Sequence, residues 1–225
     1  MMPISEVHLI DCMEFMRTLP DKFFDLAIVD PPYGIGKDGQ IKTTGGNGGR
    51  KAHAFKNWDN SIPSKKYFTE LIRVSKHQII WGANYFTQNI PGSMGWIVWD
   101  KGQRINQSDG ELAFSSFDRA LRIITMNRVQ LLIDGTIHPT QKPVALYKWL
   151  LTNYAKPGQK IFDSHMGSQS SRIAAYQLGF DYWGCELDPD YYRDGCKRFD
   201  AVIHKKDTTE YIPIEPTNTG QSKLF

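Results

Sequence analysis

The chain is poor in several features that mark particular classes of protein. It has three cysteines in 225 residues, Cys12, Cys185 and Cys196. Their number and irregular spacing argue against a disulfide framework or a structural zinc site. No apolar run approaches the roughly 20 residues of a membrane helix, and residues 1–6 lack the basic and apolar regions of a signal peptide. We therefore expect a cytoplasmic protein with no metal and no membrane contact.

A large excess of charge of one sign is also absent, because 27 Lys and Arg residues against 24 Asp and Glu residues leave a net charge of only +3. Basic residues nevertheless gather in residues 37–58, a glycine-rich stretch in which Asp38 is the single acid before Trp58. This composition predicts a basic, flexible loop that grips phosphates or closes over a ligand. The residues expected to contact nucleic acid there are Lys42, Arg50, Lys51 and Lys56.

What the chain does have is the composition of a globular protein, with 40% hydrophobic and 23% charged residues. Apolar or β-branched runs predict strands at 7–10, 26–29, 78–81, 96–99, 112–115, 121–125, 160–162 and 182–185. Helices are predicted at 12–18, 65–75, 143–154 and 170–178. Several strands are apolar on both faces, which favours an α/β fold with a doubly wound, mostly parallel sheet covered by helices on both faces. We expect one domain over residues 1–211 and a mobile tail over 212–225.

The strand at 160–162 leads into Asp163, a turn of small residues and then a helix. The next strand ends at Glu186, 23 residues after Asp163. This arrangement is typical of nucleotide-binding units in which the second acid holds a ribose. Asp163 in the turn suits an ammonium group better than a phosphate, so S-adenosylmethionine fits the pattern. Alone, a helix cap at Asp163 and a solvated strand end at Glu186 would be the ordinary interpretation.

The strand at 26–29 leads directly into Asp30-Pro31-Pro32-Tyr33. The two prolines stiffen this turn and remove two backbone donors. The Asp30 carboxylate and the Pro31 carbonyl can therefore both accept hydrogen bonds from one amino group, while Tyr33 offers a face for stacking a base. Such acceptors localise the nitrogen lone pair and stabilise the charge that develops during methyl transfer. A rigid strand-to-loop turn is the structural alternative.

Together these motifs resemble the amino-group DNA methyltransferases, in the permuted order that places the catalytic motif before the cofactor turn. The resemblance spans about residues 6–199. Besides the motifs above it rests on Asp11, Leu19-Pro20-Asp21, Trp81-Gly82-Ala83-Asn84-Tyr85, His138-Pro139-Thr140-Gln141-Lys142-Pro143 and Gly184-Cys185-Glu186-Leu187-Asp188-Pro189.

The resemblance implies a Rossmann-like fold and methyl transfer from S-adenosylmethionine to the N6 amino group of adenine in double-stranded DNA after base flipping. It also implies that Asp11 and Cys12 hold the cofactor adenine, that Glu186 binds its ribose and that Lys142 pairs with its carboxylate. The complete set expected at the cofactor is Asp11, Cys12, Asp163, His165, Gly167, Ser168, Glu186 and Lys142. A cytosine-N4 or RNA methyltransferase is the alternative, and an inactive nucleotide- or nucleic-acid-binding module is the alternative of another class.

The cofactor turn departs from the family pattern at two positions. The family has an aromatic ring where this chain has His165, and a glycine where it has Gln169. Gln169 would bring a side chain to a place where the backbone normally approaches the cofactor unhindered. We expect His165 to substitute for the ring by hydrogen bonding.

Residues 101–137 occupy the position of target recognition, where Arg104 and Arg119 are expected at the DNA. The segment is short, which predicts a short recognition sequence or loose selectivity. The chain ends Gln221-Ser222-Lys223-Leu224-Phe225, and Gln221, Leu224 and Phe225 resemble the peptide that docks onto bacterial sliding clamps. A frayed terminus is the alternative there. We expect a monomer or homodimer in a bacterial or phage-infected cell, either as a solitary enzyme or with a restriction partner.

Overall fold

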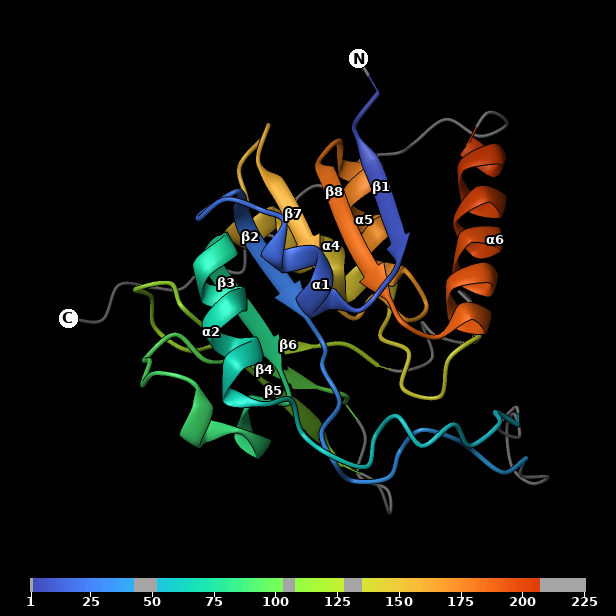
Figure 1. The fold of residues 1–225 in the computed structure, drawn as a ribbon, viewed down its shortest axis with the longest axis horizontal. Helices are drawn as coiled ribbons and strands as arrows, with labels where there is room; N and C mark the ends of the chain where they lie inside the picture. Colours follow the sequence, from blue (N-terminus) through green and yellow to red (C-terminus); the bar gives the residue numbers. More distant parts are fainter. Residues whose placement is uncertain (1, 43–51, 103–107, 128–134, 207–225) are drawn as a thin grey trace.

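A computed structural model describes residues 2–42, 52–102, 108–127 and 135–206. In these residues eight strands form one sheet in the order β1-β8-β7-β2-β3-β5-β4-β6 (Figure 1). Every neighbouring pair is parallel except the two pairs that β5 makes, with β3 and β4. The strands are β1 (Ser5–Leu9), β2 (Phe24–Val29), β3 (Ser75–Trp81), β4 (Ile97–Asp100), β5 (Gly110–Ser115), β6 (Arg122–Thr125), β7 (Lys160–Asp163) and β8 (Asp181–Glu186). All eight predicted strands are confirmed, with ends displaced by at most three residues.

Helices cover both faces of the sheet, which confirms the doubly wound α/β architecture (Figure 1). One face carries α1 (Cys12–Arg17) and α2 (Lys65–Val74), and the other carries α4 (Val144–Tyr154) and α5 (Ser170–Leu178). Two short 3-10 turns, η1 (Ala83–Tyr85) and η2 (Thr87–Asn89), follow β3. The four predicted helices are confirmed. A fifth, α6 (Pro189–Lys206), packs beside α5 and β8 and was not predicted.

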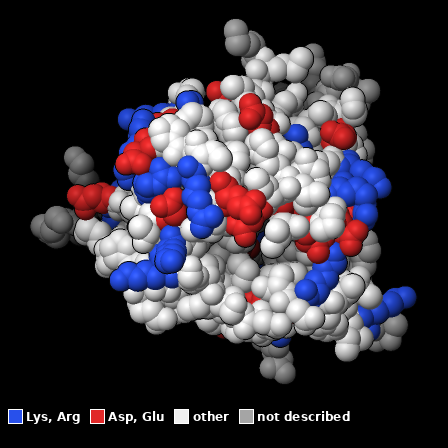
Figure 2. Space-filling view, viewed as in Figure 1, with Lys and Arg blue, Asp and Glu red and all other residues white. Residues whose placement is uncertain are grey.

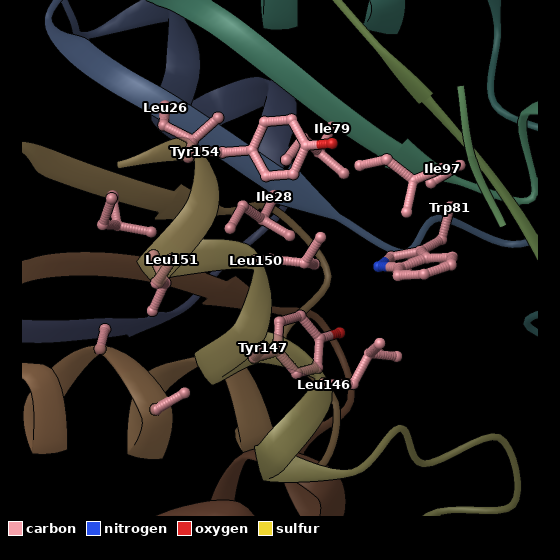
Figure 3. Packing of buried hydrophobic residues seen from close by; sticks show 14 of the residues in the cluster. Leu26, Ile28, Ile79, Trp81, Ile97, Leu146, Tyr147, Leu150, Leu151 and Tyr154 are labelled. Atoms are coloured by element: carbon pink, nitrogen blue, oxygen red, sulfur yellow. The ribbon is translucent and has the colours of Figure 1, made fainter. Parts of the chain in front are cut away.

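Strand β2 shows how the two cores hold the sheet in place. Leu26 and Ile28 face the α4 side, whereas Ala27 and Val29 face the α1 and α2 side, and all four are buried. In Figure 3, Leu150 and the other α4 side chains lie against residues of β2 and β3. Each fully buried Leu or Ile contributes about 1.5–3 kcal/mol. Since a shift of one residue would exchange the two faces, this packing fixes the position at which β2 ends and Asp30 begins.

The outer surface over α1 and α2 carries charges of both signs side by side (Figure 2). Such a mixed surface creates no broad field of one sign, in keeping with the small net charge. In the part of the chain that the structure describes, no helix is long and apolar enough to cross a bilayer.

Candidate active site

A cleft of about 1280 Å³ opens at the carboxyl ends of the parallel strands. Since β1, β8, β7, β2 and β3 all end at this edge, residues far apart in the sequence meet there. The predicted residues that line the cleft are Asp11, Cys12, Asp30, Pro31, Pro32, Tyr33, Lys56, Lys142, His165, Gly167, Ser168 and Glu186. The catalytic and cofactor motifs therefore share one cavity.

The catalytic turn leaves the end of β2 and is held by its own side chains. The Tyr33 hydroxyl donates to Asp30 Oδ1 at 2.6 Å, and the Tyr33 ring stacks on Tyr85 with centroids 5.1 Å apart. Burial raises the pKa of Asp30, an effect that Lys142 opposes. The carboxylate thus lies in a desolvated place beside an aromatic pair, which suits recognition of a flat base that carries an amino group.

Gly82, at the end of β3, makes room for this aromatic pair. Its φ is +66°, and a Cβ atom built on it would lie 2.0 Å from Tyr33 Cε1. Only glycine satisfies both the left-handed backbone and the close contact with the ring. The Trp81-Gly82 step therefore has a direct physical role in placing Tyr33.

Asp59 fixes the backbone that follows the catalytic turn, and the sequence did not point to it. Its carboxylate is 2% exposed and accepts the backbone N–H groups of Tyr33 at 2.7 Å, Gly34 at 2.8 Å and Lys37 at 2.7 Å. The Asp38 carboxylate likewise fixes the end of the basic loop, where it accepts hydrogen bonds from the backbone N–H groups of Lys56 and Asn57. Asp59 therefore ties the loop to the catalytic turn, and Asp38 joins the two ends of the basic loop.

Lys142 has a position that differs from the expected one. Its ammonium lies 2.5 Å from Asp30 Oδ2 and 3.1 Å from Glu111 Oε2, in place of a free position for a cofactor carboxylate. Glu111 also pairs with Lys101, at 2.9 Å. Burial opposes ionisation of Glu111, but Lys142 and then Lys101 lower its pKa to about 2. The Lys142 ammonium is buried, and its pairing with two half-buried carboxylates offsets the cost of removing its charge from water, which explains the difference.

The cofactor turn is shaped by Glu186 at the end of β8. Glu186 Oε2 accepts the N–H of Gly167 at 2.8 Å, and Oε1 accepts the N–H groups of Leu187 and Asp188, each at 2.9 Å. Asp11 caps α1 by accepting the N–H of Met13 at 2.6 Å. Both carboxylates remain at the cleft wall with acceptor capacity left, which fits hydroxyl and amino groups of a nucleoside.

Asp163 does not reach the cleft, in contrast to the expectation that it faces the cofactor's ammonium group. Its side chain is 1% exposed, and its oxygens accept from Ser171 Oγ at 2.6 Å and from the N–H of His165 at 3.0 Å. Burial raises its pKa to about 7. The carboxylate is turned inward because the helix start and the turn satisfy it there.

Gln169 likewise points away from the cleft, so the expected obstruction of the cofactor is absent. Its backbone is left-handed, with φ +59°, and its side chain packs over Gly195 of α6, where a Cβ would lie 2.7 Å from it. Arg172 donates to its Oε1 at 2.8 Å. The left-handed conformation aims the side chain toward α6 and leaves the cofactor side to the backbone.

His165 occupies the place of the family's aromatic ring, as a neutral group. Burial lowers its pKa to about 4. Its Nδ1 lies 2.8 Å from Ser164 Oγ, which lies 2.7 Å from the Tyr67 hydroxyl. This chain of hydrogen bonds connects the cofactor turn to α2 and supports the expectation of a hydrogen-bonding substitute.

The residues expected at DNA are placed unequally. Lys42 is exposed. Lys56 instead pairs with Asp188 at 2.7 Å and Asp190 at 2.8 Å. Arg119 lies at the far edge of the sheet, where it donates to the Asn153 carbonyl at 2.7 Å, because β5 runs antiparallel and ends away from the cleft. The residues that lie outside the described ones, and so stay predictions, are Arg50, Lys51, Arg104, Gln221, Leu224 and Phe225.

Comparison with known proteins finds relatives among the DNA methylases. The family model of the N6/N4 DNA methylases matches residues 98–197. DNA adenine methyltransferase YhdJ of Escherichia coli (strain K12) is 35% identical over 94 residues, which are 41% of this chain and 32% of YhdJ. YubD of the same organism is 40% identical over 65 residues, which are 29% of each chain. The chain thus aligns with about a third of the length of these relatives.

Solved structures share the fold over a much larger part of the chain. The complex of M1.HpyAVI with S-adenosylmethionine is 18% identical and covers 87% of this chain and 98% of its own, with a TM-score of 0.58. PvuII DNA methyltransferase, which is cytosine-N4-specific, is 10% identical and covers 88% and 87%, with a TM-score of 0.59. Motifs, fold and matches together confirm the resemblance of this chain to the amino-group DNA methyltransferases.

Proposed function

We propose that this protein transfers a methyl group from S-adenosylmethionine to the N6 amino group of adenine in DNA. The observation that carries the proposal is the shared cleft, in which Asp30-Pro31-Pro32-Tyr33 lies beside the cofactor turn. Two observations support adenine as the target. In the family that the chain resembles, an aspartate rather than a serine at the position of Asp30 is typical of the adenine-N6 type, and one relative is named as a DNA adenine methyltransferase.

The residues of the cofactor turn fit S-adenosylmethionine. Asp11 and the Cys12 backbone would hold the adenine, Glu186 the ribose, and the turn from His165 to Ser168 the methionine part. Gly167 has φ +43°, a backbone conformation that favours glycine, and a Cβ there would be in ordinary van der Waals contact with the ring of His138, at 3.4 Å. When bound, the cofactor supplies an electrophilic methyl group.

Asp30 and Pro31 act on the target base. A base turned out of the duplex would present its amino group to the Asp30 carboxylate and the Pro31 carbonyl. Accepting both amino hydrogens localises the nitrogen lone pair and stabilises the positive charge that develops on nitrogen. Tyr33 and Tyr85 offer ring faces for the base, since the outer ring, Tyr85, is 43% exposed.

The test is transfer of labelled methyl groups from S-adenosylmethionine to duplex DNA by the full chain, followed by nucleoside analysis. N6-methyladenine is the expected product. N4-methylcytosine would replace the adenine assignment with the cytosine one, and transfer to RNA alone would replace DNA as the substrate. Absence of transfer by a folded protein would overturn the proposal and favour a binding module.

A further inference from the structure

Four charged side chains, two half-buried carboxylates and two buried lysines, form a row in the half of the cleft that faces the target base. Asp30, Lys142, Glu111 and Lys101 alternate in sign, and each is in contact with the next at 2.5, 3.1 and 2.9 Å. Lys142 and Lys101 are 4% and 7% exposed. Burying an ammonium group is costly unless it is paired, and both lysines are paired with carboxylates of this row. Charges held in this way do not serve solubility, which suggests a role in the cleft.

The geometry of Lys142 places it on the catalytic carboxylate itself. Its Nζ donates to Asp30 Oδ2 and also lies 3.2 Å from the Tyr33 hydroxyl, which donates to Asp30 Oδ1. Both carboxylate oxygens are thus fixed, yet only two of about four lone-pair positions are used. An amino group of the substrate can therefore bind to Asp30 while Lys142 remains in contact with it.

Glu111 holds Lys142 from the opposite side. It stands at the start of β5, paired across the sheet with Trp99, and its own charge is supported by Lys101. The Glu111 carboxylate offsets the charge of Lys142, so the lysine does not fully neutralise Asp30. Asp30 can then still attract the positive charge that develops on a methylated amino group.

We propose that Lys142, anchored by Glu111, is a positioning residue that keeps the Asp30 carboxylate charged and correctly oriented while the target amino group binds. This inference rests on the proposed methyl transfer and assigns Lys142 to the target base in place of the cofactor.

The other ionisable groups around Asp30 do not take over this role. Tyr147 approaches from α4 and Asp163 from β7, and neither supplies a positive charge. Tyr33 and Glu111 complete the immediate surroundings, and burial raises the pKa of Tyr33 well above its usual value. Among the described residues, Lys142 is the cation in contact with Asp30.

The test compares the pH dependence of the single-turnover methyl transfer rate in variants of the full chain. Protonated Asp30 cannot accept the amino group, so the rate falls as pH drops through its pKa. Lys142→Met removes the positive charge and should move this acidic limb to higher pH by about one unit or more. Glu111→Gln removes a repelling negative charge and should move the limb to lower pH. Opposite shifts are not expected from loss of packing alone.

Two further variants complete the design. Lys142→Arg keeps the charge and should hold the limb near its wild-type position. Lys76→Met also removes a lysine–aspartate pair, with Asp25 at 2.7 Å, but far from the cleft, and should leave the profile unchanged. Shifts of the same sign, or no shift, in Lys142→Met and Glu111→Gln would overturn the inference. If methyl transfer by Lys142→Met is too slow for a pH profile, the profiles of Glu111→Gln and Lys142→Arg decide. A wild-type protein that transfers no methyl group would count against the proposed function alone.

Discussion

The acidic residues on the two sides of the cleft are stabilised in different ways. On the cofactor side, Asp11 and Glu186 at the cleft wall and Asp163 behind it accept hydrogen bonds from backbone N–H groups and a hydroxyl, and among the described residues no lysine or arginine pairs with them. On the target side, Asp30 and Glu111 are paired with buried lysines. Backbone donors fix a shape, whereas a lysine also sets the charge state. The cofactor side therefore has a fixed shape, which suits ligand binding. On the target side, the neighbouring lysines also set the ionisation state of the carboxylates.

Exchanging one carboxylate for an amide in each half gives the largest expected effects and separates the two roles. Asp30→Asn should lower the transfer rate at saturating cofactor by on the order of 1000-fold, because a charged acceptor is lost at the developing charge. Glu186→Gln should instead raise the cofactor Kd by about 10- to 100-fold, as expected for a lost charged hydrogen bond, with a smaller effect on the rate. Calorimetry gives the Kd, and quenched single turnovers give the rate.

The contrast between the two sides fails if both substitutions change the cofactor Kd and the transfer rate to the same extent. A Glu186→Gln protein that binds cofactor normally but transfers slowly would place the acid of the cofactor side in the chemistry. An Asp30→Asn protein with weakened cofactor binding would mean that the two halves are coupled.

Asp163 gives the next effect, on stability. Burial raises its pKa to about 7, above the usual value of 3.8. The folded protein therefore keeps a proton that the unfolded chain loses, so stability falls as pH rises from about 4 to about 7 and the full penalty remains above that. Asp163→Asn removes the charge and should raise the free energy of unfolding at pH 8 by about 1–2 kcal/mol relative to wild type, and by less at pH 5.

Thermal unfolding at the two pH values measures this difference. Asp25 is a suitable contrast, because burial raises its pKa but Lys76 lowers it further, to a value below the usual one. Asp25→Asn should destabilise at pH 8. Equal destabilisation by Asp163→Asn at both pH values would mean that the carboxylate is retained for its hydrogen bonds to Ser171 and His165.

Much of this architecture follows from local sequence patterns. Strands buried on both faces are readable from apolar runs, and the acids directly after them, Asp30 and Glu186, could be placed at one edge because parallel strands end together. Helix α6 also had a readable start. Asp188 accepts the N–H groups of Asp190 and Tyr191, and Pro189 occupies the first helical position, which is a typical helix beginning.

The pairings that tune the site could not be read in the same way. Glu111 reaches Lys142 only because β5 lies antiparallel to both β3 and β4, so the start of β5, in place of its end, faces the cleft. The same reversal sends Arg119 to the far edge. The inward turn of Asp163 and the outward turn of Gln169 depend on partners in α5 and α6. Strand direction and side-chain partners are properties of the whole fold.

Substitution of Lys56 gives the smallest expected effect. It tests whether an ion pair also contributes to cofactor binding on the cofactor side. Its ammonium joins the basic loop to Asp188 and Asp190, beside Glu186, the acid proposed to bind ribose, and it lies 4.6 Å from the Tyr191 ring centre. Since Lys56 and Asp188 are about a fifth exposed, their pairing contributes up to about 1 kcal/mol. Lys56→Met should therefore speed cofactor release about two- to fivefold in stopped-flow fluorescence, with Lys76→Met as control. Because Lys56 is paired with two acids, the substitution should leave the salt dependence of DNA binding unchanged. A slope of log affinity against log salt concentration that is lower by about one would show instead that Lys56 contacts a DNA phosphate, as the sequence predicts.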